Sequence, residues 1–309
     1  EEGIGDWSDA EIAVLLRTGI NPRRGGVYVP PYMPKLAHLS DEDLASIISY
    51  LRSDDPILKA DGTPSADSQP SFLVKFLCRV AFTPLEFPKS AIAQPDSTNA
   101  RALGKYLADG ALDCYGCHSA DFKTVDIAVP EKSAGYYGGG NPMLDINGNL
   151  MHTTNITSDK ATGIGKWSEA EFVQAMQSGF RPDGSLVRYP MEQYKELSPR
   201  ELSALYQFLM STPAAQNPRK ENFQYAAQGN AGEQAYYRYG CQYCHGTTGV
   251  GLADLRKAHT KFPADSVLAD VILNPGKYKR GVKMPQWSGV IKEQDIAPLC
   301  TFVRELAAK

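Results

Sequence analysis

The sequence contains no run of apolar residues that approaches the roughly 20 needed to span a bilayer. A membrane-spanning helix is therefore not expected within these 309 residues. No secretory signal peptide is visible, and the first residue is Glu rather than Met. Histidine and cysteine are scarce, with 5 and 6 copies, so the places where these two residue types gather are informative.

The remaining composition is that of an ordinary soluble globular protein, with 42% hydrophobic and 22% charged residues. The length predicts two or three domains. The net charge is −3, and we expect no nucleic-acid partner. Residues 229–309 are an exception to the acidic balance, because they contain 11 basic and 7 acidic side chains.

Cysteine and histidine gather in two C-x-x-C-H segments, CYGCH at 114–118 and CQYCH at 241–245. This spacing is typical of c-type haem attachment. Two thiols on one helical turn reach the two vinyl groups of one porphyrin, and the following histidine lies under the iron as its proximal ligand. The motifs predict two covalent haems, held by Cys114, Cys117, Cys241 and Cys244, with His118 and His245 as iron ligands.

Two other uses of C-x-x-C were considered. A thioredoxin-like redox pair needs a βαβ context, which is not apparent. A zinc site needs a second ligand pair nearby, whereas Cys78 and Cys300 stand alone. Whether these two cysteines are free or paired is left open.

The order of the predicted elements indicates the fold class. A helix leads into each attachment motif, from residues 99 and 230, and an apolar helix over 294–306 closes the chain. We predict an all-α protein of tandem cytochrome c domains with long loops around covalently bound haem. The expected parts are a partial domain over 1–54, a linker over 55–98, domains over 99–213 and 229–309, and a connector over 214–228.

The linker contains an apolar segment, residues 71–82, in which Lys75 and Arg79 are four positions apart. The segment is too short to span a membrane. It predicts an amphipathic helix, which either packs between domains or docks on a membrane surface or a partner.

The sixth iron ligand separates electron carriers from enzymes. Met191 lies 74 residues after Cys117, and Met284 lies 40 residues after Cys244, each ahead of a final helix. These positions favour both methionines as ligands. The competitors are Met143, Met151 and His152 for the first haem and His259, interpreted as a surface histidine, for the second.

An internal repeat covers the start of the chain. GIGDWSDAE at 3–11 recurs as GIGKWSEAE at 163–171, and residues 32–53 correspond to 189–211. Each copy contains serine followed three residues later by an acidic residue, which predicts N-capped helices. Met33 corresponds to Met191.

The segments TTNITSDKATGIGKWSEAEF, RYPMEQY and LSPRELSALYQFL, following C-x-x-C-H, carry a family resemblance. The chain resembles the multihaem cytochrome c subunits that accompany membrane-bound alcohol, aldehyde and gluconate dehydrogenases. The resemblance implies three haems in tandem domains, and electron transfer from a dehydrogenase towards quinone or an oxidase. It also implies that Met191 completes the haem of His118, and Met284 that of His245.

The first repeat departs from this family, because no C-x-x-C-H precedes Met33. Three explanations stay open. The chain is a fragment or an incompletely recorded mature sequence, the domain has lost its haem, or the front half comes from another polypeptide. Met33 is an axial iron ligand on the first and third explanations, and a third haem is expected if residues upstream of Glu1 exist.

The function expected is that of an electron carrier and not an enzyme, because an iron with both axial positions filled binds no substrate. The alternative is a dihaem redox enzyme of the peroxidase or thiosulfate-oxidising type, for which Cys78, Cys300 and His152 are the candidate residues. Cys300 lies inside an apolar helix, which favours its interpretation as core. A structural subunit is a third possibility. Since haem is attached outside the bacterial cytoplasm, we expect a targeting segment to have been removed or omitted. We expect a periplasmic protein that is either free or associated with the membrane. The expected partners are a dehydrogenase subunit and a quinone-linked or oxidase complex.

Overall fold

The structure is a computed structural model that describes residues 3–24, 27–28, 33–60, 62–63, 69, 71–80, 84–218, 229–279 and 281–308. Side chains of residues 24, 27–28, 78–80 and 308 are not among those described. The chain divides into two compact units, residues 1–137 and 138–309. Each unit is described by itself. The boundary lies inside the expected domain 99–213, and the domain limits given above stay a prediction.

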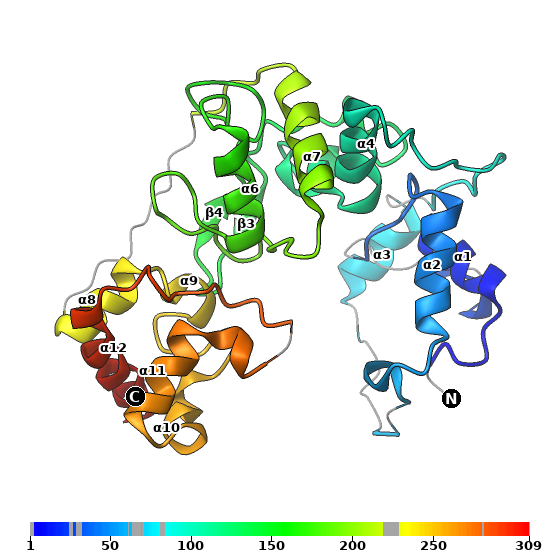
Figure 1. Cartoon of the computed structure of the whole chain (residues 1–309). Helices are drawn as coiled ribbons and strands as arrows, with labels where there is room; N and C mark the ends of the chain where they lie inside the picture. Colours follow the sequence, from blue (N-terminus) through cyan, green and yellow to red (C-terminus); the bar gives the residue numbers. More distant parts are fainter. Residues whose placement is uncertain are drawn as a thin grey trace. The chain divides into compact units, whose positions relative to one another are not determined.

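The described chain is mostly helical, as expected, and its strands form two short antiparallel hairpins, β1–β2 and β3–β4 (Figure 1). The helices of the first unit are α1 (Asp9–Thr18), α2 (Asp41–Leu51), α3 (Phe72–Val80), α4 (Ala100–Lys105) and α5 (Cys114–His118), with strands β1 (Ile20–Asn21) and β2 (Val27–Tyr28). The second unit contains β3 (Pro142–Leu144), β4 (Leu150–His152), α6 (Glu169–Ser178), α7 (Pro199–Ser211), α8 (Ala231–Arg238), α9 (Gln242–His245), α10 (Ala258–Lys261), α11 (Asp265–Leu273) and α12 (Glu293–Glu305).

The internal repeat is confirmed as a repeat of structure. Helices α1 and α6 begin at Ser8 and Ser168, each with a complete capping box, and both end at a left-handed glycine. Helices α2 and α7 are N-capped by Ser40 and Ser198. The same backbone hydrogen bond joins the two halves of each copy, Leu36 N to Leu16 O at 2.8 Å and Tyr194 N to Met176 O at 2.8 Å.

In the first unit, the segment ahead of α2 is held from inside by the buried Arg17. Its guanidinium donates to the carbonyl oxygens of Leu36 (2.9 Å) and Leu39 and pairs with Asp41 at 2.6 Å. A buried cation is tolerated because these acceptors replace its water. The polypeptide between Met33 and α2 therefore has one fixed path.

The same segment packs against residues that follow α4. The Tyr106 hydroxyl accepts a hydrogen bond from Ser40 N at 3.0 Å and also bonds to Asp43. A Cβ on Gly110 would lie 3.0 Å from His38 O, and His38 Nε2 lies 2.6 Å from Ile127 O. The first repeat is thus joined to the stretch that carries the first attachment motif.

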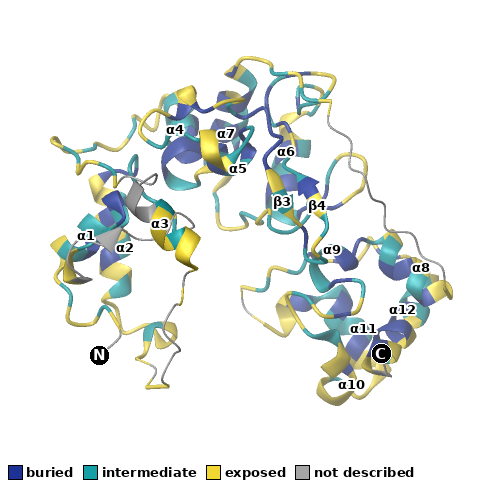
Figure 2. Ribbon diagram, turned by 180° about the vertical axis from the view of Figure 1, so that it is seen from behind, coloured by how far each residue is buried: buried dark blue, intermediate teal, exposed yellow. Residues whose placement is uncertain are grey.

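Helix α3 confirms the helix expected over 71–82, of which residues 81 and 82 lie outside the described residues. Phe72, Leu73 and Phe76 are exposed, with 84% of Phe72 accessible, and the described part of the helix is drawn in yellow and teal in Figure 2. Phe72 and Phe76 stack on one face at 6.3 Å between ring centroids. None of the helices in the described parts of the chain is long and apolar enough to cross a membrane.

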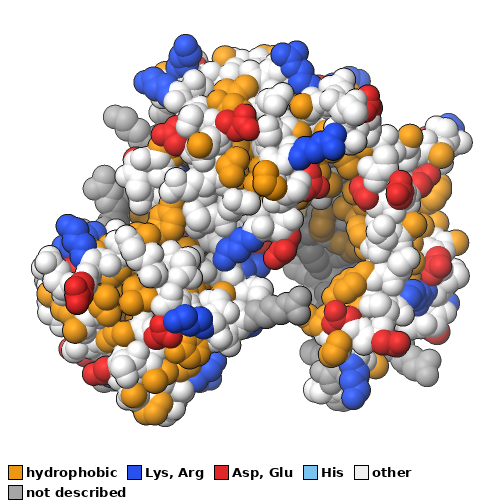
Figure 3. All heavy atoms as spheres, in the orientation of Figure 1, with side chains coloured by type: hydrophobic (Ala, Val, Ile, Leu, Met, Phe, Trp, Pro, Cys, Tyr) orange, Lys and Arg blue, Asp and Glu red, His pale blue; other side chains and the backbone are white. Residues whose placement is uncertain are grey.

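Charged side chains lie in small groups on the face drawn in Figure 3, where Lys and Arg are interspersed with Asp and Glu. Of the basic residues ahead of Met284, Lys277 pairs with Asp270 at 3.0 Å and Lys283 pairs with Glu192. These two lysines are therefore partly neutralised by the protein itself.

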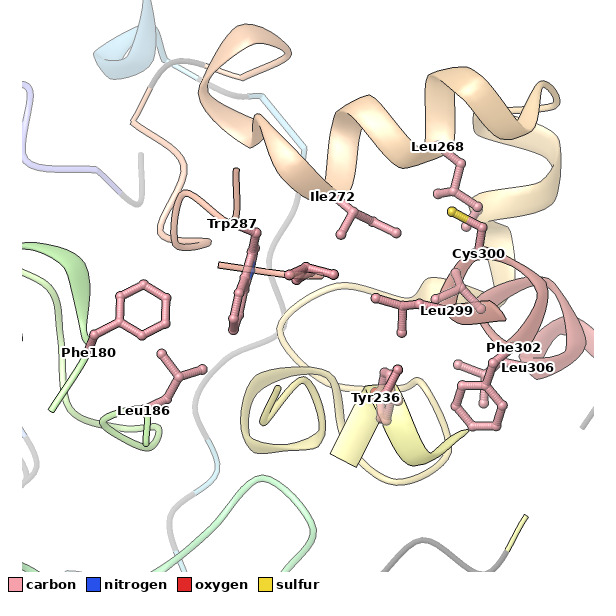
Figure 4. Packing of buried hydrophobic residues seen from close by; sticks show 14 residues of the cluster. Phe180, Leu186, Tyr236, Leu268, Ile272, Trp287, Leu299, Cys300, Phe302 and Leu306 are labelled. Atoms are coloured by element: carbon pink, nitrogen blue, oxygen red, sulfur yellow. The ribbon is translucent and has the colours of Figure 1, made fainter. Parts of the chain in front are cut away.

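The core of the second unit joins the last segment of the chain to the loop after α6 (Figure 4). Its buried members come mainly from α8, α11 and α12, and include Trp287. Phe180 and Leu186 enter the same cluster from the preceding repeat. The Phe180 and Trp287 rings meet edge to face at 5.3 Å. Residues on both sides of the 219–228 stretch therefore share one core.

Helices α8 and α12 cross at Gly232. A Cβ on this glycine would lie 2.1 Å from Pro298 O and 2.7 Å from Phe302 Cβ, so only glycine permits the approach. The start of α12 is tied to the end of α8, since Arg238 and Tyr239 both donate to Asp295, at 2.9 and 2.8 Å.

We predict that Gly232→Ala destabilises the second unit by about 3 kcal/mol, because the added methyl meets a backbone carbonyl that cannot rotate away. Denaturant unfolding followed by circular dichroism measures the change. Gly276→Ala is the matched control, since nothing lies within 4 Å of its Cβ position. Equal unfolding midpoints for the two variants would contradict the close crossing.

Candidate haem sites

The first attachment motif forms the single turn α5. Asp113 precedes it in the left-handed region (φ 50°), and its carbonyl accepts from Gly116 N at 3.1 Å. A Cβ on Gly116 would lie 2.6 Å from Asp113 Oδ2, so a side chain there would displace the Asp113 carboxylate. Cys114 and Cys117 are partly exposed free thiols, whereas His118 is buried. The turn thus leaves both sulfurs available from one short segment.

A buried carboxylate, Asp109, lies in the π-helical turn ahead of this motif. It accepts hydrogen bonds from the hydroxyls of Tyr136, at 2.8 Å, and Tyr137, and from the ammonium of Lys105. These donors compensate the loss of water around the charge. Tyrosines near this motif therefore hold the backbone turn in place through hydrogen bonds.

The second motif follows α8. Gly240 turns the chain in the left-handed region (φ 72°), and α9 carries the motif to His245. The buried Tyr236 hydroxyl donates to the carbonyl of Gly246, the residue after the histidine, at 2.7 Å. A Cβ on Gly251 would lie 2.3 Å from Cys244 O, so the returning chain packs directly behind the motif.

The thiols are not those of a reactive redox pair. Burial raises the pKa of Cys241 to about 12, and burial together with the charges of Asp113 and Asp109 raises the pKa of Cys114 to about 12. Reactive cysteines have a lowered pKa. Among the described residues, no group of three or more His, Cys, Asp or Glu side chains is placed to hold a metal ion.

His245 fits the role of a proximal ligand. Its Nδ1 is buried and has no hydrogen-bond partner among the described residues. Burial lowers the pKa of the ring, against the opposing effect of the Ala253 carbonyl, so the imidazole is neutral at pH 7. Neutral imidazole is the form that binds iron. Two free thiols and a neutral imidazole within one turn are the donor set that haem c requires.

Met284 lies near the same interior as the second motif. Met284 and Cys241 are both partly buried and both pack against the core cluster of the second unit. Trp287, three residues on, is buried among the Phe180 and Tyr239 rings. It therefore serves as aromatic core. The attachment cysteine and the methionine predicted for this site therefore both border the same core cluster.

Met191 belongs to the second unit, whereas Cys114 and Cys117 belong to the first. It is 36% exposed, and its backbone N–H donates to Arg188 O at 2.9 Å. Met33, its counterpart in the first repeat, is half-buried.

The alternative candidates for the sixth iron ligand lie elsewhere in the structure. Met151 is buried in β4, next to the half-buried His152, and Met143 is half-buried in β3. His259 is exposed, as expected, with Nδ1 2.8 Å from Arg256 O. Cys300 is a free thiol buried in α12, so the interpretation as core is confirmed. The side chain of Cys78 lies outside those described.

Two residues beside the second site were missed in the sequence. Asn147 contacts the attachment segment, and Lys195 contacts the segment with Met284. The D-x-N-G-N spacing at 145–149 signals a turn, but not what the turn touches. No sequence pattern predicts the contacts of Lys195, because its hydrogen-bond acceptors are backbone carbonyl oxygens that are distant along the chain.

Comparison with known proteins also supports the interpretation as a cytochrome c. Residues 227–303 match the family described as cytochrome c oxidase, cbb3-type, subunit III. The chain is 24% identical to the cytochrome c subunit of a quinone alcohol dehydrogenase of Gluconobacter oxydans, over 99% of this chain and 68% of that protein. The chain is a relative of dehydrogenase cytochrome c subunits.

Further relatives agree with this assignment. The gluconate 2-dehydrogenase cytochrome c subunit of Pantoea cypripedii is 24% identical over 98% of this chain and 74% of its own length. A diheme cytochrome c-type protein of Cereibacter sphaeroides is 25% identical over 69% of each chain. The family resemblance that the motifs indicate is therefore confirmed, and the similarity covers nearly the whole of this chain.

We predict that Tyr236→Phe lowers the stability of the second unit by about 1–2 kcal/mol, because the Gly246 carbonyl beside His245 loses its buried donor. Denaturant unfolding measures the loss. Tyr50→Phe, which removes a hydroxyl from an exposed ring, is the control and is expected to leave the midpoint unchanged. An unchanged unfolding midpoint in Tyr236→Phe would show that this hydrogen bond does not stabilise the motif.

Proposed function

We propose that the protein is a periplasmic multihaem c-type cytochrome, which carries electrons between a dehydrogenase and a respiratory acceptor through His/Met-ligated haems. Haem c supplies the Fe(III)/Fe(II) couple. The single observation that carries the proposal is the pairing of a C-x-x-C-H turn with Met284 against one core cluster, in a chain related over nearly its full length to dehydrogenase cytochrome c subunits.

The protein's own residues have defined tasks in this function. Cys241 and Cys244 would hold the porphyrin through thioethers, and His245 and Met284 would supply the protein ligands of the iron. A thioether ligand raises the reduction potential, which suits acceptance of electrons from a dehydrogenase. The apolar cluster around Trp287 excludes water from the site and limits reorganisation during electron transfer.

The middle site is proposed on the same pattern. Cys114 and Cys117 attach the haem, His118 is the proximal ligand, and Met191 is the sixth ligand. If residues upstream of Glu1 or another polypeptide supply a further attachment motif, Met33 would be the corresponding ligand in the first repeat. The irons bound by His118 and His245 then have no open position for a substrate, so the protein acts as an electron carrier for a catalytic partner subunit.

The proposed partners are a dehydrogenase subunit and a quinone-linked or oxidase complex. A periplasmic location is proposed because haem is attached covalently outside the bacterial cytoplasm. The exposed apolar face of α3, with Phe72, Leu73 and Phe76, is compatible with association at a membrane or a partner.

Haem attachment is tested by intact mass and iron content. We predict two haems on the 309-residue chain, one haem on the Cys114→Ala/Cys117→Ala double variant, and one on Cys241→Ala/Cys244→Ala. Each pair should be lost independently, because the motifs lie in different units. Wild-type protein without covalent haem would refute the proposal.

Axial ligation is tested by the near-infrared Met–iron charge-transfer band of the oxidised protein. Met284→Ala is expected to remove half of the intensity and to lower one reduction potential, because the thioether ligand is lost. Met143→Ala, in the β3 strand, is the control and should keep the full band. Full intensity in Met284→Ala would exclude this residue as a ligand, whereas only half of the two-haem intensity in the wild-type protein would favour the dihaem enzyme instead.

A further inference from the structure

The second unit contains an internal junction, defined here as the contact between residues 138–198 and residues 229–308. Its apolar part is Phe180 and Leu186 against Trp287. Figure 4 shows the Phe180 and Leu186 side chains directed towards the Trp287 indole from a separate stretch of ribbon. This contact brings the repeat that holds Met191 against the segment that holds Met284.

One polar contact of the junction reaches the attachment segment. Asn147 Oδ1 accepts from Thr247 N at 2.7 Å, and Asn147 Nδ2 lies 3.5 Å from Gln242 O. The asparagine is held in turn by Asp145 Oδ1, which accepts from Asn147 N at 2.9 Å. A preorganised side chain loses less conformational entropy when it makes such bonds.

A second polar contact reaches the methionine segment. Lys195 Nζ donates to Val282 O at 3.0 Å and lies 3.4 Å from Met284 O. A second lysine, Lys283 of the methionine segment, pairs with Glu192 of the repeat. The segment 191–195 and the segment 282–284 are therefore joined by two lysines, one from each side.

We propose that Lys195 is a positioning residue for Met284, so that the repeat carrying one axial methionine holds the loop carrying the other. The inference rests on the proposed function, because it requires Met284 to be an iron ligand. An iron–thioether bond is weak, and it persists only when the protein holds the sulfur in place. The Lys195 ammonium does this by donating to the Val282 carbonyl, two residues before the ligand, and by a longer contact of 3.4 Å with the carbonyl of Met284 itself.

The test is an imidazole titration of the oxidised, haem-loaded full chain, followed by loss of the Met–iron band. Imidazole replaces methionine only when the methionine loop opens, so its apparent affinity reports how firmly the loop is held. The transition of the C-terminal haem is the one that disappears in Met284→Ala. For Lys195→Met we expect the apparent imidazole affinity at this haem to rise about fivefold, since one charged donor in a solvent-exposed setting is lost.

Lys166→Met is the matched control, because Lys166 is an exposed lysine of the same unit. The apparent imidazole affinity of this variant should equal that of the wild type. Lys195→Arg retains a cationic donor and is expected to restore most of the wild-type affinity. An unchanged affinity in Lys195→Met, with the transition still abolished by Met284→Ala, overturns the positioning role and leaves the proposed ligation intact. A full band in Met284→Ala overturns the ligation and this inference with it.

Discussion

The second unit depends on the close approach of α8 and α12 at Gly232. A glycine is needed there because a backbone carbonyl and an aromatic side chain occupy the place of a Cβ. The crossing sets the direction in which α8 delivers Cys241 and the turn that follows. The same helices supply most of the cluster against which Met284 packs. One steric constraint therefore orients both sides of the proposed iron site.

The two units use their repeats in similar ways. In the first, the segment between Met33 and α2 contacts the stretch around Tyr106 and Ile127, beside an attachment motif. In the second, the segment that follows Met191 contacts the stretch around Met284. In the first case the repeat is joined to the stretch that carries an attachment motif, and in the second to the segment that carries the predicted methionine ligand.

Much of the candidate site was predictable because its chemistry is local. The C-x-x-C-H turns need only neighbouring residues, and the capped starts of α1, α6 and α7 follow from Ser and Glu three positions apart. The buried state of Cys300 followed from the apolar pattern of α12. Helices α10 and α11 were not predicted, since α10 is a four-residue turn with one apolar residue and α11, although apolar, begins without a capping side chain.

The sequence by itself determined the repeat, the helical class and the family resemblance, and it predicted the attachment residues, because all four depend on spacings within short stretches. Only the tertiary structure decided that Trp287 is core, that Asn147 reaches the Thr247 amide, and that Lys195 holds the Met284 carbonyl. These contacts join residues about 90 to 110 positions apart. Such bonds to backbone atoms leave no pattern in the sequence, since every residue offers the same carbonyl.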